Sequence, residues 1–300
     1  MNFAVKADTV VVDAFEHERS QILRRQRTQT AFSVLIFSVI LAISLERSGF
    51  IGADLGADPV GRVVSLLHRL SPDLRLEALF AGRRTPGSLA SWYYDLPLWL
   101  KAAWQTFEMA VLSSAFGTFG GVLAGFLCAR NLMPFAPLRF VVRRTLEAIR
   151  TLPEIIIALI LVAAFGVGPF AGILALSIST MGGLGKLFSE INEQVDDRPI
   201  EALQASGANR LRQIRFGVLP QVLPAYASYG LIRLEANIGG AAGLGIVGAG
   251  GIGIELQRAI TFTEYDTYLA ILLLIVGMIF AIDVTSEKIR HHLLGLARDK

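Results

Sequence analysis

The sequence predicts an all-α, polytopic membrane protein with about six transmembrane helices. Hydrophobic residues make up 53% of the 300 residues, charged residues only 18%, and the mean hydropathy is +0.54. That balance is too apolar for a soluble domain. Uncharged apolar runs long enough to cross a bilayer recur along the chain. The lone cysteine, Cys128, lies inside one of these runs, so neither a disulfide framework nor a thiolate metal site is expected.

Two of the expected spans lie in the first part of the chain. A charged leader, residues 1–29, precedes a first span over 30–45. The loop that follows, 46–101, is charged, contains four prolines and ends in a cluster of Trp and Tyr. Because these aromatic residues favour the headgroup interface, we expect interfacial segments in this external loop rather than a folded domain. The second span covers about 102–128.

The other spans follow in the second half. From Ile155 to Gly185 no residue is charged, and this stretch is too long for one helix. Gly166-Val167-Gly168-Pro169 interrupts it, so we expect a hairpin of a third and a fourth span. The fifth span covers about 218–238 and the sixth about 266–284. The expected core is therefore 102–285, followed by a tail, 286–300.

The distribution of Lys and Arg predicts the orientation of these spans. Residues 1–30, 129–150 and 186–220 hold five each and the tail holds four, so nineteen fall on one side if six spans alternate. Eight fall on the other side, seven of them in the long 46–101 loop, where charge bias is weaker. Both termini and the 186–220 loop are therefore expected to be cytoplasmic.

That cytoplasmic loop contains a helix–glycine–helix pattern, EALQASGANRLRQIRFGVLP, from Glu201 to Pro220. It resembles the EAA loop of ABC importer permeases, which reads Glu-Ala-Ala, three residues, Gly, nine residues and Ile-x-Leu-Pro. The third alanine of the frame is Leu203 here, and its isoleucine is Gly217. The resemblance implies that the loop docks a cytoplasmic ATPase. The residues expected to carry the docking are Glu201, Ala202, Ser206, Gly207, Ala208, Arg210 and Pro220.

The second span carries a ladder of small residues, Ser113, Gly117, Gly121 and Gly125, at every fourth position. These residues share one face of a helix, and small residues let helices approach closely in lipid. The spacing leaves open whether the ladder meets a helix of the same chain or of a second subunit.

The end of the fifth span combines ionisable residues with glycines. Arg233, Glu235 and Asn237 lie inside the span or at its outer end, where ionisable groups are costly and usually face the protein interior or a cavity. Arg233 and Glu235 are two apart, so they are expected to reach partners on other helices. The plain alternative is a pair of side chains that snorkel to the membrane surface.

The segment 239–253 literally satisfies the G-x-G-x-x-G dinucleotide fingerprint, but a membrane span rather than a strand precedes it, and the rest of the chain offers no parallel sheet. We expect it to form non-helical or tightly packed backbone at membrane depth. The predicted pathway or gate residues are therefore Arg233, Glu235, Asn237, Gly248, Gly250, Gly251 and Gly253.

The string from Glu235 to Gly253, together with GANRLRQIRFGVLPQVLP (207–224), resembles the signature of phosphonate ABC transporter permeases. The resemblance covers roughly residues 100–290. Members of that family commonly carry an arginine where this chain has Gly239.

What the resemblance implies is a type I ABC importer permease in the bacterial inner membrane. Two permease subunits, identical or different, would join two cytoplasmic ATPases and an external substrate-binding protein. The substrate would be a phosphonate or a related oxyanion such as phosphate or phosphite. The chain has no Walker A motif, so it is expected to be no enzyme, to hold no cofactor and to leave ATP and Mg²⁺ to the ATPase. No nucleic acid partner is expected.

Three alternatives remain on the sequence. The chain could be a permease for another small solute of the same class. A secondary transporter would need inverted repeats, and no internal repeat is clear. A membrane-embedded enzyme would need a catalytic cluster of His, Asp, Glu or Ser, and the spans contain none.

Overall fold

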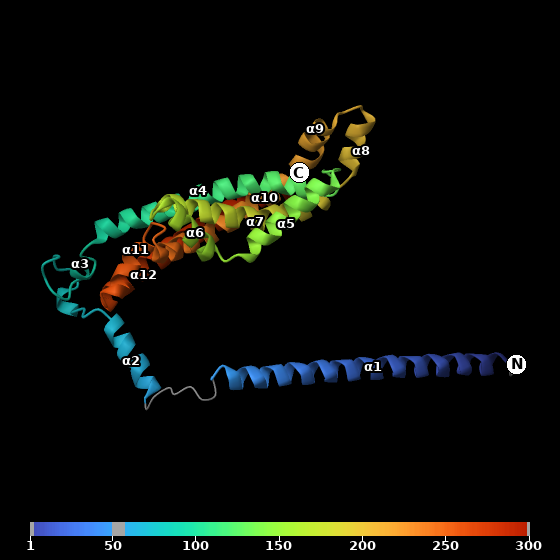
Figure 1. Cartoon of the computed structure of the whole chain (residues 1–300), viewed down its shortest axis with the longest axis horizontal. Coiled ribbons are helices and arrows are strands. Elements are labelled where there is room, and N and C mark those ends of the chain that lie inside the picture. The colour runs from blue at the N-terminus through green and yellow to red at the C-terminus, as the bar shows by residue number, and fades with distance from the viewer. Residues whose placement is uncertain (1–2, 50–57, 299–300) are drawn as a thin grey trace. The chain divides into compact units, whose positions relative to one another are not determined.

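The computed structural model describes residues 3–49 and 58–298, and every regular element in this part of the chain is helical (Figure 1). The chain divides into two compact units, Met1–Ser65 and Leu66–Lys300. Residues 50–57 of the predicted external loop, and the two residues at each end of the chain, lie outside the described residues.

The first unit is dominated by one long helix, α1 (Phe3–Arg47). The predicted leader and first span therefore form one uninterrupted helix. Its stretch Leu23–Arg47 is long and apolar enough to cross a membrane, and none of that stretch is buried against the rest of the protein. Exposed Phe32, Leu35 and Phe37 suit a lipid environment. A second helix, α2 (Pro59–Leu70), follows.

The second unit is built around the long helices α4 (Leu96–Cys128), α7 (Pro169–Glu193), α10 (Leu219–Leu244) and α12 (Tyr265–Arg298). The small-residue ladder of α4 lies against α7 of the same chain. A Cβ atom placed on Gly117 would stand 2.4 Å from Thr180 Cβ, and one on Gly125 would stand 2.8 Å from Phe188 Cβ. The absence of side chains at these positions therefore sets the close spacing of the two helices.

The expected hairpin of two spans has a different first arm. The turn lies at Gly166–Gly168 as expected, but α6 (Glu154–Phe165) has only 12 residues. At 1.5 Å per residue that is about 18 Å, too short for a hydrocarbon core of about 30 Å. An amphipathic helix, α5 (Ala136–Thr151), precedes it and meets it at 94°. The bent pair, rather than α6 alone, could form one broken span.

Among the described residues, four helices are long and apolar enough to cross a membrane, or five if the bent pair is one span. The helix of the expected fifth span, α10, has 26 residues, or about 39 Å, but its polar residues keep it outside that set. If α10 also crosses, the chain crosses six times.

The segment that precedes α4 is more tightly packed than expected. Short elements η1 (Leu76–Ala78) and α3 (Leu89–Trp92) precede α4. The indole N–H of Trp92 donates to the Asp266 carbonyl at 2.9 Å, and Trp99 is only 2% exposed in a core cluster with residues of α11 (Gly253–Thr261) and α12. Trp104, by contrast, is 60% exposed. Part of the aromatic cluster thus joins the protein core instead of facing lipid headgroups.

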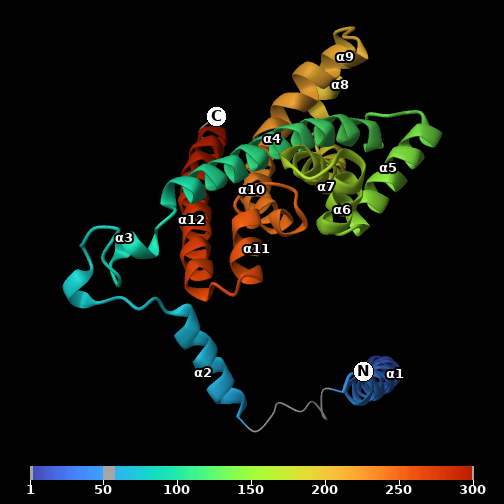
Figure 2. The ribbon, with the colours of Figure 1, turned by 60° about the vertical axis from the view of Figure 1, so that its left-hand side comes forward.

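At the opposite end of this unit, α8 (Arg198–Ala205) and α9 (Arg210–Gln213) stand out from the long helices (Figures 1 and 2). A π-helical turn, η2 (Ile214–Val218), leads from α9 into α10. A short 3-10 turn, η3 (Gly245–Val247), ends α10.

Candidate functional site

A polar network crosses the interior of the second unit, centred on Arg233 of α10. The terminal guanidinium nitrogen donates to Glu154 Oε1 at 2.5 Å and to Ser179 Oγ at 3.0 Å. The Nε–H donates to Thr180 Oγ1 at 3.1 Å, and the Ser179 hydroxyl also donates to Glu154 Oε1, at 2.8 Å. One arginine therefore joins α10 to α6 and α7.

The network continues through Asn237, one turn along α10. Its side chain is 1% exposed and lies 3.0 to 3.2 Å from the Thr180 hydroxyl. Its Nδ2 donates to Ser114 Oγ on α4 at 2.8 Å. Every polar atom of this amide thus has a partner inside the protein, which is what a buried amide requires. Asn237 holds α4, α7 and α10 together behind Arg233.

Local sequence places Glu154 at this site. It is the first residue of α6, where an acidic side chain is stabilised by the positive end of the helix dipole. Gly240 of α10 leaves room for it, since a Cβ atom there would stand 3.1 Å from Glu154 Oε2. The bend between α5 and α6 and the missing side chain at Gly240 together bring the carboxylate to Arg233.

The site lies deep in the helices but is not closed. Arg233 is near the middle of α10, and Ser179 and Thr180 are near the middle of α7. Of the two expected positions for Arg233, inside the span or at its outer end, the structure has the first. The side chains of Arg233 and Glu154 are 26% and 31% exposed. A partly accessible guanidinium at such a depth is energetically costly, and such residues usually mark a functional site. In a low-dielectric wall, the guanidinium attracts an oxyanion more strongly than it would in water.

Glu235 belongs to a different contact. Its carboxylate lies 3.8 Å from the Arg290 guanidinium of α12, on the other side of α10. Arg233 and Glu235 therefore each reach another helix and do not face each other. The structure does not bring Glu235 into the Arg233 site.

The glycine-rich segment forms a buried turn between η3 and α11. Gly248, Gly250 and Gly251 have φ values of +83°, +98° and +73°, which glycine adopts without strain. A Cβ atom on Gly253 would stand 1.9 Å from the Ala242 carbonyl oxygen, and one on Gly250 would stand 2.9 Å from Pro169 Cα. These glycines are required by the close approach of backbone segments.

Several N–H groups of this turn already have acceptors within the protein. Gly251 N–H donates to Gln105 Oε1 at 3.3 Å and Ile252 N–H to Thr106 Oγ1 at 2.8 Å. Gly248 N–H donates to the Gly245 carbonyl, and the Gly248 carbonyl accepts from Gly168 N–H. The turn lies about 20 Å along α10 from Arg233, at 1.5 Å per residue. It is packed beyond the C-terminal end of α10 and is separate from the arginine site.

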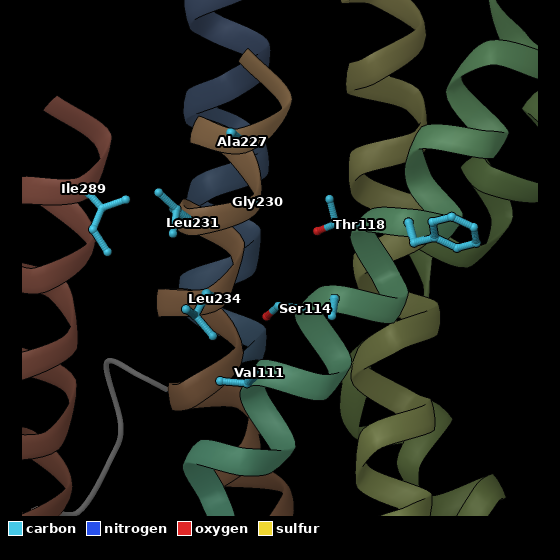
Figure 3. A pocket seen from close by; sticks show the side chains of 10 residues that line it. Val111, Ser114, Thr118, Ala227, Gly230, Leu231, Leu234 and Ile289 are labelled. Carbon is cyan, nitrogen blue, oxygen red and sulfur yellow. The ribbon is translucent and has the colours of Figure 1, made fainter. Parts of the chain in front are cut away.

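An open groove of about 520 Å³ lies between α4, α10 and α12 (Figure 3). Val111, Ser114 and Thr118 of α4 point toward α10, and Leu231 of α10 points toward Ile289 of α12 (Figure 3). Ser114 lines the groove and also accepts from Asn237, so the groove backs onto the polar network. Its lining is almost wholly apolar, which does not suit an anion.

The EAA-like loop forms a helix–turn–helix at the exposed end. Gly207, with φ +75°, follows the last turn of α8. Gly207 N–H donates to the Gln204 carbonyl and Ala208 N–H to the Leu203 carbonyl, the bond pair of a Schellman motif. Asn209 then caps α9 by accepting from Arg212 N–H at 3.0 Å. The outer surface is exposed and consists of Glu201, Ala202, Ser206, Gly207 and Arg210, while Pro220 lies in the first turn of α10.

The two residues that depart from the EAA frame, Leu203 and Gly217, lie against each other. A Cβ atom on Gly217 would stand 3.3 Å from Leu203 Cδ1 and 3.2 Å from Ile200 Cγ1. The larger residue at 203 therefore fills the space that the missing side chain at 217 leaves.

This contact predicts compensation between the two positions. Gly217→Ile alone should overpack the site and lower stability by about 1–3 kcal/mol, whereas Leu203→Ala with Gly217→Ile should recover most of that loss. Thermal unfolding midpoints of both single variants and the double variant check the prediction. A double variant no more stable than Gly217→Ile would disprove the compensation.

Four residues of the network, Ser114, Glu154, Ser179 and Thr180, were not expected from the sequence. The available signal was a lone carboxylate directly before the uncharged Ile155–Gly185 run, and two hydroxyls in the last third of that run. Among residues 3–49 and 58–298, no three His, Cys, Asp or Glu side chains gather closely enough to hold a metal ion.

Comparisons with known proteins agree with this architecture. Residues 121–291 match the family described as binding-protein-dependent transport system inner membrane component. The chain is 37% identical over 194 residues to the phosphite transport system permease protein PtxC of Stutzerimonas stutzeri, covering 65% of this chain and 70% of that protein. It is 37% identical over 193 residues to the phosphate-import permease protein PhnE of Mycolicibacterium smegmatis, covering 64% of this chain but only 36% of that longer protein.

Among solved structures, a chain of the MetNI methionine ABC transporter in an inward-facing conformation aligns with a TM-score of 0.57. The alignment covers 66% of this chain and 97% of that chain at 23% identity, so it establishes the fold alone. The chain therefore belongs to the family of binding-protein-dependent transport system inner membrane components, and it is a multi-pass permease subunit of a bacterial ABC importer with the type I fold.

Proposed function

We propose that this permease imports a phosphorus oxyanion, such as phosphite, phosphate or a phosphonate, across the inner membrane. The observation that carries the proposal is the partly exposed Arg233 at mid-depth, surrounded by hydroxyl and amide groups. A guanidinium with neighbouring hydroxyl donors suits a tetrahedral oxyanion. The relatives named for phosphite and phosphate transport support the same class of substrate.

The proposed assembly supplies what the chain lacks. The exposed α8–α9 surface would receive a cytoplasmic ATPase dimer, which binds ATP and Mg²⁺, because the chain has no Walker A motif. An external binding protein would deliver the substrate, and a second permease subunit, identical or different, would complete the pathway. Closure of the ATPase dimer would push on α8 and rock the core helices from inward-open to outward-open.

Gly239 marks a difference from the phosphonate permeases that the sequence resembles. A Cβ atom at Gly239 would meet nothing within 4 Å, so contacts at the backbone do not require glycine there. We propose that Arg233 alone supplies the guanidinium charge for the substrate in this subunit.

Uptake in cells tests the proposed function. A strain without the gene should lose uptake of labelled phosphite, phosphate or methylphosphonate, and the wild-type gene should restore it when the ATPase and binding protein are present. Methionine uptake is the control and should not change. If the gene restored uptake of methionine but of no phosphorus oxyanion, the proposed substrate class would be rejected.

The topology is a separate prediction. Both termini are proposed to be cytoplasmic, from the nineteen-to-eight division of Lys and Arg. Reporter fusions at residue 300 and near residue 75 should therefore lie on opposite sides of the membrane. The same side for both reporters would contradict the alternating layout.

A further inference from the structure

We propose that Glu154 is a resident counter-anion, which occupies the place of the substrate on Arg233 until an oxyanion displaces it. The inference rests on the proposed function and assigns control of substrate affinity to a residue outside the predicted pathway set. The substrate exchanges with a carboxylate of the protein instead of binding to a free cation.

The first support is the way the donors converge. The Arg233 guanidinium at 2.5 Å and the Ser179 hydroxyl at 2.8 Å both donate to the same oxygen, Glu154 Oε1. Thr180 accepts from the Nε–H of Arg233 and so fixes the plane of the guanidinium. A phosphorus oxyanion would use the same two donors in the same way. The carboxylate thus stands where an oxyanion oxygen would bind.

The second support is that Glu154 can leave without breaking the fold. It is the first residue of α6, directly after the 94° bend, and its side chain is 31% exposed. Its other carboxylate oxygen, Oε2, lies beside Gly240, which has no side chain. Rotation of the Glu154 side chain is therefore enough to expose the donors of Arg233 and Ser179, while Thr180 and Asn237 hold α7 and α10 in place.

The consequence for transport is a site that binds the substrate weakly. An unpaired arginine at this depth would hold a phosphorus oxyanion tightly and release it slowly. Because the substrate must displace Glu154, the binding free energy is reduced by the lost ion pair. When the substrate departs, the carboxylate returns and neutralises Arg233. This arrangement suits a permease that receives its substrate from a binding protein and must release it on the other side.

The test is direct binding of labelled phosphate and phosphite to the full permease–ATPase complex in lipid nanodiscs. Glu154→Gln should tighten binding at least about tenfold, the scale of one charge-assisted hydrogen bond. Glu190→Gln, which removes the same charge from an exposed position of α7, should bind as the wild type does. Arg233→Gln should remove binding, alone or with Glu154→Gln.

Unchanged or weaker binding by Glu154→Gln, or no binding by any variant, would overturn the inference. If Glu154→Gln does not assemble, Glu154→Asp, with a carboxylate one carbon shorter, should give a smaller tightening, and no tightening again overturns the inference. Uptake by the wild-type complex distinguishes the failure of the counter-anion proposal from the failure of the proposed function. If the wild type takes up phosphorus oxyanions but Glu154→Gln does not tighten their binding, only the counter-anion proposal is rejected. If the wild type takes up no such anion, the proposed function is rejected.

Discussion

Replacing Arg233 with alanine is expected to lower substrate uptake by at least about thirtyfold. The pair with Glu154 is partly buried and hydrogen-bonded, so its loss is placed at the lower end of the roughly 2–5 kcal/mol that truncating one member of a buried pair costs. The change removes the proposed anion-binding charge and leaves Glu154 without its partner. Arg233→Lys keeps the charge but cannot donate from two nitrogens to Glu154, Ser179 and Thr180. Its uptake should therefore be intermediate. The measurement is uptake at equal membrane levels with the ATPase and binding protein present.

The matched control is Arg258→Ala. Arg258 pairs with Glu255 at 2.8 Å, but its side chain is 57% exposed, and surface ion pairs contribute little. Uptake should be close to wild type. Glu235→Gln should also differ from Arg233→Ala, because Glu235 contacts Arg290 instead. Wild-type uptake in Arg233→Ala and Arg233→Lys would exclude a pathway role for this arginine.

Replacing Gly207 with leucine is expected to abolish transport and the stimulation of the ATPase while leaving membrane insertion intact. A Cβ atom at Gly207 meets nothing within 4 Å, so the new side chain projects from the proposed docking surface. The φ of +75° adds a local strain of about 1–2 kcal/mol for leucine. Gly207→Asn, which tolerates this conformation better, should keep more activity. ATPase activity and uptake of the purified complex measure both effects.

Gly49 offers a control with the same local geometry. It follows the last turn of α1 at the equivalent position, has φ +68° and also leaves open space for a Cβ atom. Gly49→Leu therefore carries similar backbone strain but changes no residue of α8 or α9. Equal loss of coupling in Gly49→Leu and Gly207→Leu would mean that strain, rather than docking, explains the result.

Local patterns predicted the helices and turns of this protein well, because their causes lie within a few residues. The apolar run broken at Gly166–Pro169, the helix break at Gly207 and the small-residue ladder of α4 all follow from side-chain size and backbone freedom. The spacing of Arg233 and Glu235 likewise predicted partners on other helices. These inferences needed no knowledge of the tertiary structure.

The composition of the site could not be predicted in the same way. Glu154 is 79 residues from Arg233 in sequence and reaches it only because α5 and α6 meet at 94° and Gly240 lacks a side chain. The packing of the glycine-rich turn was also beyond local prediction. Its pattern indicated tightly packed backbone, but not that its packing partners would be Thr106 and Pro169 on distant helices. Long-range packing decided both cases.

ATP-dependent uptake into proteoliposomes tests the central claim most directly. The vesicles would contain this permease with its ATPase, and the binding protein and labelled phosphite, phosphate or methylphosphonate would be added on the external side. We expect accumulation of at least one of these anions, which requires ATP hydrolysis and the binding protein and is lost in Arg233→Ala. Accumulation of these anions without ATP would contradict the account. So would vesicles that accumulate another solute but none of the three anions.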